Sequence, residues 1–550
     1  MTEYLKKNWK IIAFAAVILL ATYLRIWHFH DWLFFKMDQA RDAFLTKQVY
    51  DFGPGWLPLL GPKAGGTKLN LGPVFYYFQY LPTVLFHSTS PQVMAYPDLF
   101  FSILSIPLFY LLLKKYFDRS WSMILASAYA LCFLAIEYSR FAWNPNSLPF
   151  FNLLFFYALL NVFDEKRKYR ARWVALAGAS FAVSTQLHFL SFLTLPLVTF
   201  VFLIVERREI LRYLDWKKIT LFFVVILLCY APVFANEIYT HGRDTKEFFA
   251  AIQEKASNHS LAKNIARDAV YFGENWLTIL TGYIGKSKQE TPASLTWIFF
   301  IVPALYLNIR FYRRENNPAR RKFLLVTFCW FIVYFLAYIP IAYDIRPRFF
   351  LPMIVLPFIF AGYISTYLQS LSKKNKIFWS GAALAVIVAI IVTNLVGTFQ
   401  WFREIKSAQK RGVYPKRTII LKARDGIVLW HLEKAAEYVA GDCQYPVAYY
   451  STNAEYKYPV RYLLALKNIS GISFKNFDPN RSGCFYAFGL TRSKKGLDSA
   501  VEKKFDVLNQ EKFGALTVYK LNPKEEFLNN PNPKKEKPEE GRIFWKDLKI

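Results

Sequence analysis

The chain has 550 residues and a formal net charge of +30, yet 54% of its residues are hydrophobic and 19% are aromatic. A water-soluble protein with that apolar fraction would have no solvent for 53 phenylalanines and 35 tyrosines. Two apolar runs, 11–27 and 377–397, are each close to the length of a helix that crosses the ~30 Å hydrocarbon core of a bilayer. Composition therefore excludes a soluble globular class and predicts a mainly α-helical, polytopic membrane protein.

Eleven apolar segments are predicted to cross the membrane, and they follow one another along the first 400 residues. The first run follows three lysines, but no small-residue cleavage site comes after it, so we interpret it as an uncleaved anchor. In the long run 173–205, a hairpin that turns near His188 keeps both basic flanks on one side. The eleven segments are 11–27, 94–113, 120–138, 148–163, 173–187, 189–205, 219–235, 295–309, 323–341, 349–370 and 377–397.

The positive-inside rule orients these segments with the N-terminus in the cytoplasm. The six stretches assigned to the cytoplasm are 1–10, 114–119, 164–172, 206–218, 310–322 and 371–376, and they hold 25 Lys or Arg in 57 residues. The two long outer loops, 28–93 and 236–294, hold only 12 in 125. The apolar run 71–86 is predicted to lie in the interface, because a crossing there would move the basic stretch 114–119 outside. We expect the protein in the cytoplasmic (inner) membrane.

Residues 401–550 have no apolar run long enough to cross a membrane. Strand-like pieces at 446–450, 484–488 and 515–521 alternate with helix-like pieces at 427–440 and 497–507, so 401–528 is predicted to be an extracytoplasmic α/β domain. Residues 529–550, which begin with a Pro- and Lys-rich stretch, are predicted to be a flexible tail. Cys443 and Cys484 both lie in the outer domain, where they are either a disulfide or two buried thiols.

Charged residues gather just beyond the first predicted span. Asp38 and Asp42 lie at i and i+4 with Arg41 between them, so both carboxylates share one face of a helix. Further polar residues fall at the same predicted outer surface, where lipid headgroups lie, whereas a transporter would place ionisable groups near mid-bilayer. The chain has no Walker loop, Rossmann fingerprint or G-x-S-x-G elbow, so ATP-driven transport has no support in the sequence.

This arrangement suits transfer of a group from a lipid phosphate. Arginines bind phosphate through charge-assisted hydrogen bonds and stabilise it as a leaving group. A carboxylate takes the proton from the attacking group as a general base. One base and one stabilised leaving group give a single displacement at a sugar carbon, which inverts its configuration.

At these residues the chain resembles the GT-C superfamily of polytopic glycosyltransferases, in the branch of the protein O-mannosyltransferases and the lipid A aminoarabinose transferase. The resemblance covers roughly residues 10–400, and it implies a sugar donor linked to polyprenyl phosphate, with Asp38 as the base. Two positions depart from the family pattern, because Gln39 and Asn144 stand where the superfamily often has acids. The matching motifs are Leu24-Arg25-Ile26, Asp38-Gln39-Ala40-Arg41, Gly72-Pro73-Val74-Phe75-Tyr76-Tyr77, Ser139-Arg140-Phe141-Ala142 and Arg348-Phe349-Phe350-Leu351-Pro352.

The site residues are assigned to three roles. Asp38 is the expected base and Asp42 a helper, although Glu237 could supply the second acid instead. The expected ligands of the donor phosphate are Arg346, Arg348, Arg25, Arg41, Lys63 and Lys68. The expected contacts to acceptor or sugar are Asn144, Arg140, His188, Glu237, Tyr76 and Tyr77. For each residue the alternative is structural: arginines that snorkel to headgroups, an Asn144 helix cap, or a His188 turn.

The expected partners are the bilayer, a polyprenyl-phosphate sugar and an acceptor glycan, lipid or protein, but not nucleic acid. No cofactor and no metal site are predicted, and the need for a divalent metal stays open because of Gln39 and Asn144. The functional alternative is a non-catalytic binding or transport protein for lipid-linked sugars. That protein would share the phosphate-binding arginines but would need no base.

Overall fold

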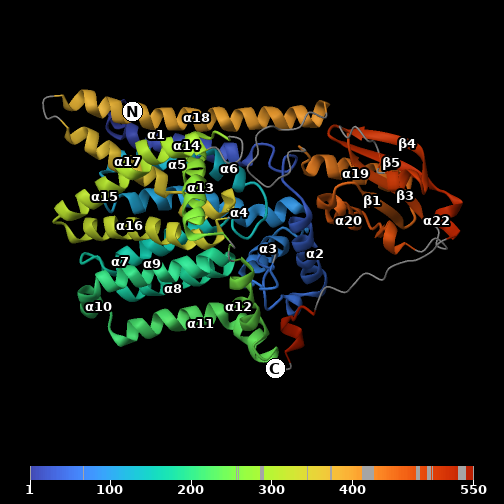
Figure 1. The fold of residues 1–550 in the computed structure, drawn as a ribbon, viewed down its shortest axis with the longest axis horizontal. Helices are drawn as coiled ribbons and strands as arrows, with labels where there is room; N and C mark the ends of the chain where they lie inside the picture. The colour runs from blue at the N-terminus through green and yellow to red at the C-terminus, as the bar shows by residue number, and fades with distance from the viewer. Residues whose placement is uncertain are drawn as a thin grey trace.

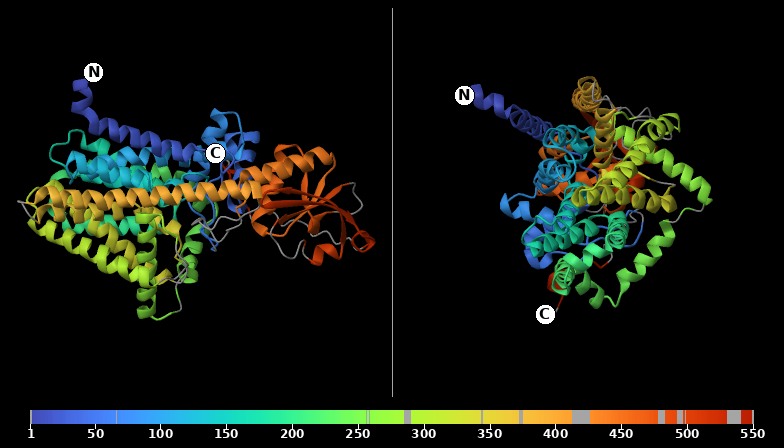
Figure 2. Two further views of the ribbon diagram at one scale, coloured as in Figure 1. Left: turned by 90° about the horizontal axis from the view of Figure 1, so that it is seen from above. Right: turned by 90° about the vertical axis from the view of Figure 1, so that its left-hand side faces the viewer.

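The computed structural model describes residues 2–548 except 66, 256, 258, 285–289, 343–344, 372–374, 412–425, 478–482, 492–496, 498 and 530–540. A helical bundle and a sheet domain lie at its two ends, and the long helix α18 (Lys376–Arg411) runs from one to the other (Figure 1, Figure 2). Its 36 residues are roughly 54 Å long at 1.5 Å per residue. The helix therefore continues well past the predicted crossing 377–397 and carries the sheet domain away from the bundle.

Six helical stretches among the described residues are long and apolar enough to cross a membrane. A bent pair, η4 (Pro347–Met353) and α17 (Leu356–Ser370), would make a seventh, with a bend of 57°. The six are Asn8–Ile26, Pro91–Leu113, Trp216–Tyr239, Thr291–Arg314, Pro318–Ile341 and Ile377–Lys410. They belong to α1 (Thr2–Ile26), α4 (Pro91–Leu113), α11 (Trp216–Tyr239), α14 (Glu290–Thr296) with the π-helical η2 (Trp297–Ile301) and α15 (Val302–Arg314), α16 (Pro318–Tyr338) with η3 (Ile339–Ile341), and α18. A mainly helical, multi-pass membrane fold is thus confirmed.

The other four predicted crossings correspond to shorter helices, so the count of eleven stays a prediction. They are α5 (Arg119–Ala130) with α6 (Phe133–Tyr138), α7 (Leu148–Val162), α8 (Arg170–Leu187) and α9 (Phe189–Val205). The chain leaves the helical conformation at His188, where the hairpin was predicted, and α8 packs against both α7 and α9.

The predicted crossing 120–138 is wrong as one continuous helix, because the chain breaks between α5 and α6. Polar side chains from two other helices bind the backbone groups that the break exposes. Arg25 donates to the Ala130 carbonyl at 2.9 Å, and the Asn394 side chain accepts from the Phe133 N–H at 2.8 Å. A broken backbone at membrane depth is tolerated when it is buried in protein and hydrogen-bonded in this way.

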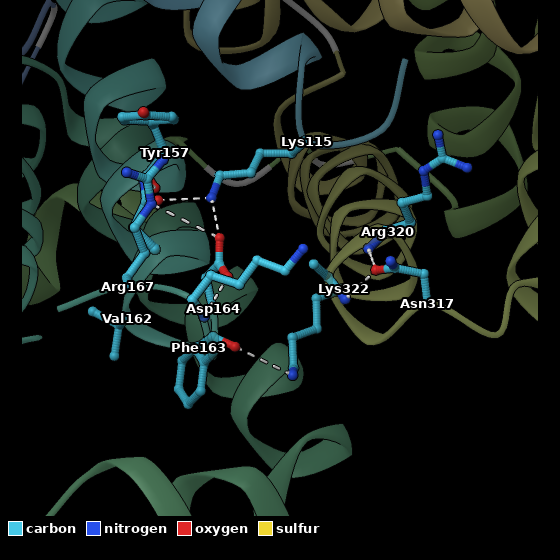
Figure 3. Close-up of polar contacts among 12 residues, drawn as sticks. Lys115, Tyr157, Val162, Phe163, Asp164, Arg167, Asn317, Arg320 and Lys322 are labelled. Atoms are coloured by element: carbon cyan, nitrogen blue, oxygen red, sulfur yellow. Dashed lines mark hydrogen bonds and ion pairs between the residues drawn. The ribbon is translucent and has the colours of Figure 1, made fainter. Parts of the chain in front are cut away.

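Segments predicted to face the cytoplasm meet at the bundle end remote from the sheet domain, where α10 (Arg207–Tyr213) also lies (Figure 1). Figure 3 shows three of these segments joined by polar contacts. Lys115 donates to Asp164 at 2.8 Å, and Lys322 donates to the Phe163 carbonyl at 3.4 Å. The basic residues that oriented the chain in sequence thus lie together at one end.

Segments predicted to be extracytoplasmic lie at the other end, toward the sheet domain (Figure 1). They form α2 (Met37–Phe52), η1 (Pro54–Trp56), α3 (Val74–Leu85) and α12 (Arg243–Lys255). Helix α13 (Leu261–Thr281), from the same predicted loop as α12, instead packs against the bundle helices α16, α17 and α18. Helix α3 has 12 residues, too few to cross a bilayer, which agrees with the interfacial position predicted for 71–86. Helix α13 runs across the direction of the bundle helices (Figure 1).

The sheet domain is a five-stranded mixed sheet in the order β2-β1-β3-β5-β4, with α19 (Leu429–Asp442) and α20 (Lys457–Leu466) packed on it. The β1–β2 and β1–β3 pairs are parallel, and β3–β5 and β4–β5 are antiparallel. Cys443 and Cys484 form a disulfide. The strands are β1 (Val447–Ser451), β2 (Gly471–Ser473), β3 (Cys484–Leu490), β4 (Phe505–Phe513) and β5 (Leu516–Pro523), with short helical turns η5 (Ala454–Tyr456), η6 (Phe474–Asn476), α21 (Ser499–Glu502) and α22 (Glu525–Asn529). The last turn, η7 (Trp545–Asp547), packs on η1 instead of on the sheet.

Two sequence predictions for this domain need correction. The helix expected at 497–507 shrinks to α21, because Phe505 already begins β4 and pairs with Pro523. The predicted flexible tail 529–550 includes an ordered part: residues 541–548 are described and pack on the first outer loop, whereas 530–540 and 549–550 lie outside the described residues.

Candidate active site

Helix α2 begins the site, and its first turn carries Asp38. An acidic side chain in the first turn interacts favourably with the helix dipole. Gln39 accepts a hydrogen bond from the Lys36 N–H at 3.2 Å, so the residue that departs from the family pattern closes the start of this helix. Gln39 is buried, which leaves Asp38 as the accessible acidic group of this turn.

Arg41 joins Asp38 and Asp42, the first two of the three aspartates of α2. It donates to Asp38 at 3.1 Å and to Asp42 at 2.9 Å. The side chain of Asp38 is 41% exposed and that of Asp42 is 1% exposed. The two aspartates share one helix face, as the sequence predicted, but only Asp38 is open to a substrate.

Tyr76 from the first turn of α3 covers Asp42. Its hydroxyl donates to the carboxylate at 2.9 Å, and a second link between α2 and α3 runs from Thr46 to Gln79 at 3.1 Å. Burial raises the pKa of Asp42, and the charge of Arg41 opposes that rise. Asp42 therefore holds Arg41 in place from inside, and Arg41 in turn contacts Asp38.

Arg348 forms a second part of the site at the start of η4. Its guanidinium lies 4.8 Å from the centroid of the Trp143 ring and 5.4 Å from that of Phe349. The loop 61–72 passes close by, since a Cβ placed at Gly65 would lie 3.5 Å from the Arg348 guanidinium. That loop leads directly into α3 and Tyr76, so it connects the Arg348 cluster with the carboxylates of α2.

Two further predicted cations, Lys63 and Lys68, lie on the loop that approaches Arg348, and a third, Arg346, precedes Arg348 by two residues. Lys63 and Lys68 are exposed on the loop 61–72, and Arg346 is partly buried just before η4. The same loop is fixed to α12 through Asn70, whose N–H donates to Asp244 at 3.2 Å. Lys63 and Lys68 thus lie on the loop 61–72 with Arg348 beside it, and the exposure of the two lysines suits them to bind an anionic headgroup.

Asp98 was missed by sequence reasoning, and it organises the loop 139–147. It accepts from the Trp143 N–H at 3.0 Å and from the Ser147 hydroxyl at 2.5 Å. Asn144 fixes the same loop by donating to the Leu187 carbonyl at 2.6 Å. The available signal was a lone carboxylate inside an apolar span, which is costly unless it is bound.

Two predicted ligands turn out to be structural. Arg140 is 1% exposed and donates to the carbonyls of Leu24, Arg25, Trp27 and His28, so it caps the end of α1 instead of contacting an acceptor. Arg25 is completely buried and binds Ser102 and two carbonyls inside the bundle. Both arginines satisfy backbone groups at helix ends, where unpaired carbonyls would be costly.

Other predicted contacts also have structural partners. His188 accepts from the Leu190 N–H at 3.2 Å and caps α9, and Glu237 accepts from Thr245 near the start of α12. The hydroxyl of Tyr77 donates to the Pro58 carbonyl at 3.1 Å. Within the described part of the chain, no group of three or more His, Cys, Asp or Glu side chains is arranged to hold a metal ion.

The chain was compared with protein-family models and with solved structures. Residues 70–235 match the family model of the dolichyl-phosphate-mannose-protein mannosyltransferases. The structure of ArnT from Cupriavidus metallidurans bound to undecaprenyl phosphate aligns with a TM-score of 0.57 at 14% identity, over 93% of this chain and 98% of ArnT. The apo structure of the same ArnT gives 0.56 at 13% identity, over 94% and 98%.

This chain has the GT-C fold of ArnT. The fold implied by the resemblance over residues 10–400 is thereby confirmed, and the similarity also extends over the C-terminal sheet domain, since the alignment covers nearly the whole length of both chains. A weaker similarity, with a TM-score of 0.49 and 13% identity, relates 88% of this chain to 70% of the Archaeoglobus fulgidus oligosaccharyltransferase in the apo form. No curated protein matches the chain in sequence.

Within the GT-C fold, the family match and the site overlap only in part. The matched residues 70–235 include Tyr76 and the loop 139–147, but Asp38, Arg346 and Arg348 lie outside them. The roles of those three residues therefore depend on geometry: an accessible carboxylate at the start of α2 and cations at the same end of the bundle.

Proposed function

We propose that this protein is an inverting glycosyltransferase that moves a sugar from a polyprenyl-phosphate donor to an acceptor hydroxyl or amine. Transfer takes place on the extracytoplasmic side, at the end of the bundle that carries α2 and the sheet domain. The proposal includes eleven crossings in the cytoplasmic (inner) membrane, a catalytic membrane domain over 1–400 and an outer domain over 401–528 that helps to bind the acceptor.

The observation that supports the proposal is that Asp38 is exposed while Asp42 is buried, and that both contact Arg41. A general base must be reachable by its substrate and held in position. Asp38 is reachable and contacts Arg41, while the buried Asp42 holds Arg41 from the other side. A protein that only binds lipid phosphate would need the cations but not this supported carboxylate. The fold adds weight, because ArnT is described in a complex with undecaprenyl phosphate.

The reaction follows from the placement of these groups. The Asp38 carboxylate takes the proton from the acceptor hydroxyl or amine as its oxygen or nitrogen forms a bond to the anomeric carbon. The bond from that carbon to the phosphate oxygen breaks on the opposite face, and the polyprenyl phosphate leaves with the bonding electrons. Arg346 and Arg348, with Lys63 and Lys68, neutralise the charge that develops on the phosphate.

The test compares Asp38→Asn with Asp51→Asn in the full-length protein. Asp51 is a matched control because it lies on the same helix, and its side chain is 39% exposed. Release of undecaprenyl phosphate is measured from a panel of undecaprenyl-phosphate-linked hexoses and pentoses, with bacterial membranes as the source of acceptor. Asp38→Asn should lower turnover by about 10²- to 10⁴-fold and leave lipid binding intact, while Asp51→Asn should match the wild type.

Two results would overturn the proposal. Turnover by Asp38→Asn at the wild-type rate would remove the assigned base. Binding of undecaprenyl phosphate without turnover of any donor would favour the alternative, a binding or transport protein. The anomeric configuration of the product, read by NMR, tests inversion separately, since retention would require a covalent intermediate.

A further inference from the structure

The C-terminal segment 541–548 returns to the site. It leaves the sheet domain and lies against the first outer loop, where it pairs with residues 57–59 (Figure 1). The Leu59 N–H donates to the Ile543 carbonyl at 3.0 Å, and the Trp545 N–H donates to the Leu57 carbonyl at 3.1 Å, forming an antiparallel bridge. A segment held by two backbone hydrogen bonds has a defined register on that loop.

Side chains fix the same segment more firmly. The indole N–H of Trp545 donates to the Tyr77 hydroxyl at 2.9 Å. Lys546 lies 3.1 Å from the centroid of the Trp56 ring, and Phe544 packs against that ring at 5.3 Å. Aromatic and cation–π contacts of this kind add to the backbone pairing. Docking therefore uses both backbone and side chains, and Tyr77 is one of its anchors.

Docking brings Arg542 to the neighbouring tyrosine of α3. The guanidinium of Arg542 lies 5.3 Å from the centroid of the Tyr76 ring, within the range of a cation–π contact. The Tyr76 hydroxyl donates at the same time to Asp42 at 2.9 Å. Tyr76 is thus held on two sides, since its ring contacts a cation and its hydroxyl donates to a carboxylate.

We propose that residues 541–548 are an integral strap of the active site and that Arg542 is a positioning residue, which acts through Tyr76 on Asp42. The inference rests on the proposed function, because it assigns the strap to the same reaction. The order of contacts is Arg542, Tyr76, Asp42, Arg41 and Asp38, each touching the next. The far end of the chain thus supports the carboxylate that takes the proton.

Docking is tested first, without reference to activity. A Cβ at Gly55 would lie 3.5 Å from the Lys546 Cβ, which is within the 3.5–4.5 Å range of a disulfide. The full-length double variant Gly55→Cys, Lys546→Cys should therefore form an intramolecular bond under mild oxidation, detected as a linked peptide by mass spectrometry. A Gly55→Cys, Lys503→Cys pair is the control, since Lys503 is exposed in the sheet domain. Failure of the first pair to link more than the control would overturn the strap.

The disulfide-linked protein also tests whether the docked segment completes the active site or blocks it. If the docked segment completes the site, the oxidised Gly55→Cys, Lys546→Cys protein should turn over the undecaprenyl-phosphate sugar panel at the rate of its reduced form. Inhibition on oxidation that is reversed by reductant would overturn the proposal, because it would mean that the docked segment blocks the site.

A double-mutant cycle tests the role of Arg542. Arg542→Gln should lower kcat about tenfold with little change in KM, and Arg542→Lys should recover part of that loss. In a Tyr76→Phe background, Arg542→Gln should cause no further loss, because its route through the hydroxyl is already absent. Lys503→Gln removes the same charge from an exposed position and should leave kcat unchanged.

The outcomes keep the two proposals apart. Additive losses in the cycle, or wild-type kcat in Arg542→Gln, would overturn the positioning role while turnover and its dependence on Asp38 stand. Loss of the proposed function itself appears as wild-type turnover in Asp38→Asn or as no donor turnover by the unmodified protein. In that case, formation of the disulfide between Gly55→Cys and Lys546→Cys still shows whether residues 541–548 dock.

Discussion

Tyr76→Phe removes one oxygen atom from the site and keeps the ring. In the wild type, the hydroxyl donates to Asp42 at 2.9 Å, and both residues are at most 2% exposed. The substitution leaves the buried carboxylate bound to Arg41 and opens almost no space. Its effect therefore measures the bond between α3 and α2.

The expected magnitude follows from the charge of the acceptor. A hydrogen bond to a charged group contributes about 1.5–3 kcal/mol, against about 1 kcal/mol for a neutral pair. Tyr462→Phe is the matched control, because Tyr462 is also buried and its hydroxyl donates to the neutral carbonyl of Thr89 at 2.5 Å. We expect a loss of about 2 kcal/mol of unfolding free energy in Tyr76→Phe and about 1 kcal/mol in Tyr462→Phe. Asp38→Asn should cost less than about 1 kcal/mol, because its ion pair is partly exposed.

The assay is equilibrium unfolding of the full-length variants by SDS in mixed micelles, with turnover measured on the same preparations. Tyr76→Phe should lose stability and part of its turnover, whereas Asp38→Asn should lose turnover and keep its stability. Equal stabilities for Tyr76→Phe and the wild type would refute the reasoning, because Asp42 would then not depend on the hydroxyl. A stability loss in Asp38→Asn as large as that in Tyr76→Phe would refute the assignment of a catalytic role to Asp38 and a structural role to Asp42.

Three further predictions concern the frame around the site. Hydrogen bonds to Glu433 and Asp31 raise the pKa of His30 to about 9. The stability that His30 adds is therefore complete below its ordinary pKa of 6.5 and is lost as pH rises through about 9. The melting temperatures of the wild type and His30→Ala should differ at pH 6 and converge near pH 10, and a difference that stays constant with pH would contradict this linkage. Replacing Cys443 and Cys484 by Ser opens a loop with a sequence separation of 41 and should destabilise the sheet domain by up to about 4 kcal/mol, measured by proteolysis of that domain with the single Cys229→Ser variant as control. Arg140→Met should lower the yield of folded protein in size-exclusion chromatography instead of raising KM, because it leaves buried carbonyls unpaired; folded protein with only a weaker acceptor affinity would restore the original assignment of Arg140.

The order of the helices was predictable because apolar length and basic flanks act locally. Each predicted crossing corresponds to one or more helices, and the basic stretches meet at one end of the bundle. The local sequence pattern did not predict a helix break where a side chain distant in the sequence replaces the hydrogen bonds within the helix. The break between α5 and α6 depends on Arg25 and Asn394, and neither lies near residues 130–133 in the sequence.

The carboxylates of the site were predictable, but their different exposures were not. The spacing of Asp38 and Asp42 placed both on one face of a helix, and that face was found. Which of them stays open depends on Tyr76, which comes from another helix and covers only Asp42. Arg140 shows the opposite case. Its motif predicted a contact to the acceptor, but its guanidinium binds backbone carbonyls at the end of α1.

The sequence by itself determined the membrane class, the approximate helices, the basic stretches between them and the acidic pair at the start of α2. Those features follow from residue type and short-range spacing, which do not depend on distant parts of the chain. Only the tertiary structure decided that Asp38 is accessible while Asp42 is buried, that Arg25 and Arg140 are structural, and that residues 541–548 lie beside Tyr76. These outcomes depend on contacts between residues tens to hundreds of positions apart, and such contacts leave no periodic signal in the sequence.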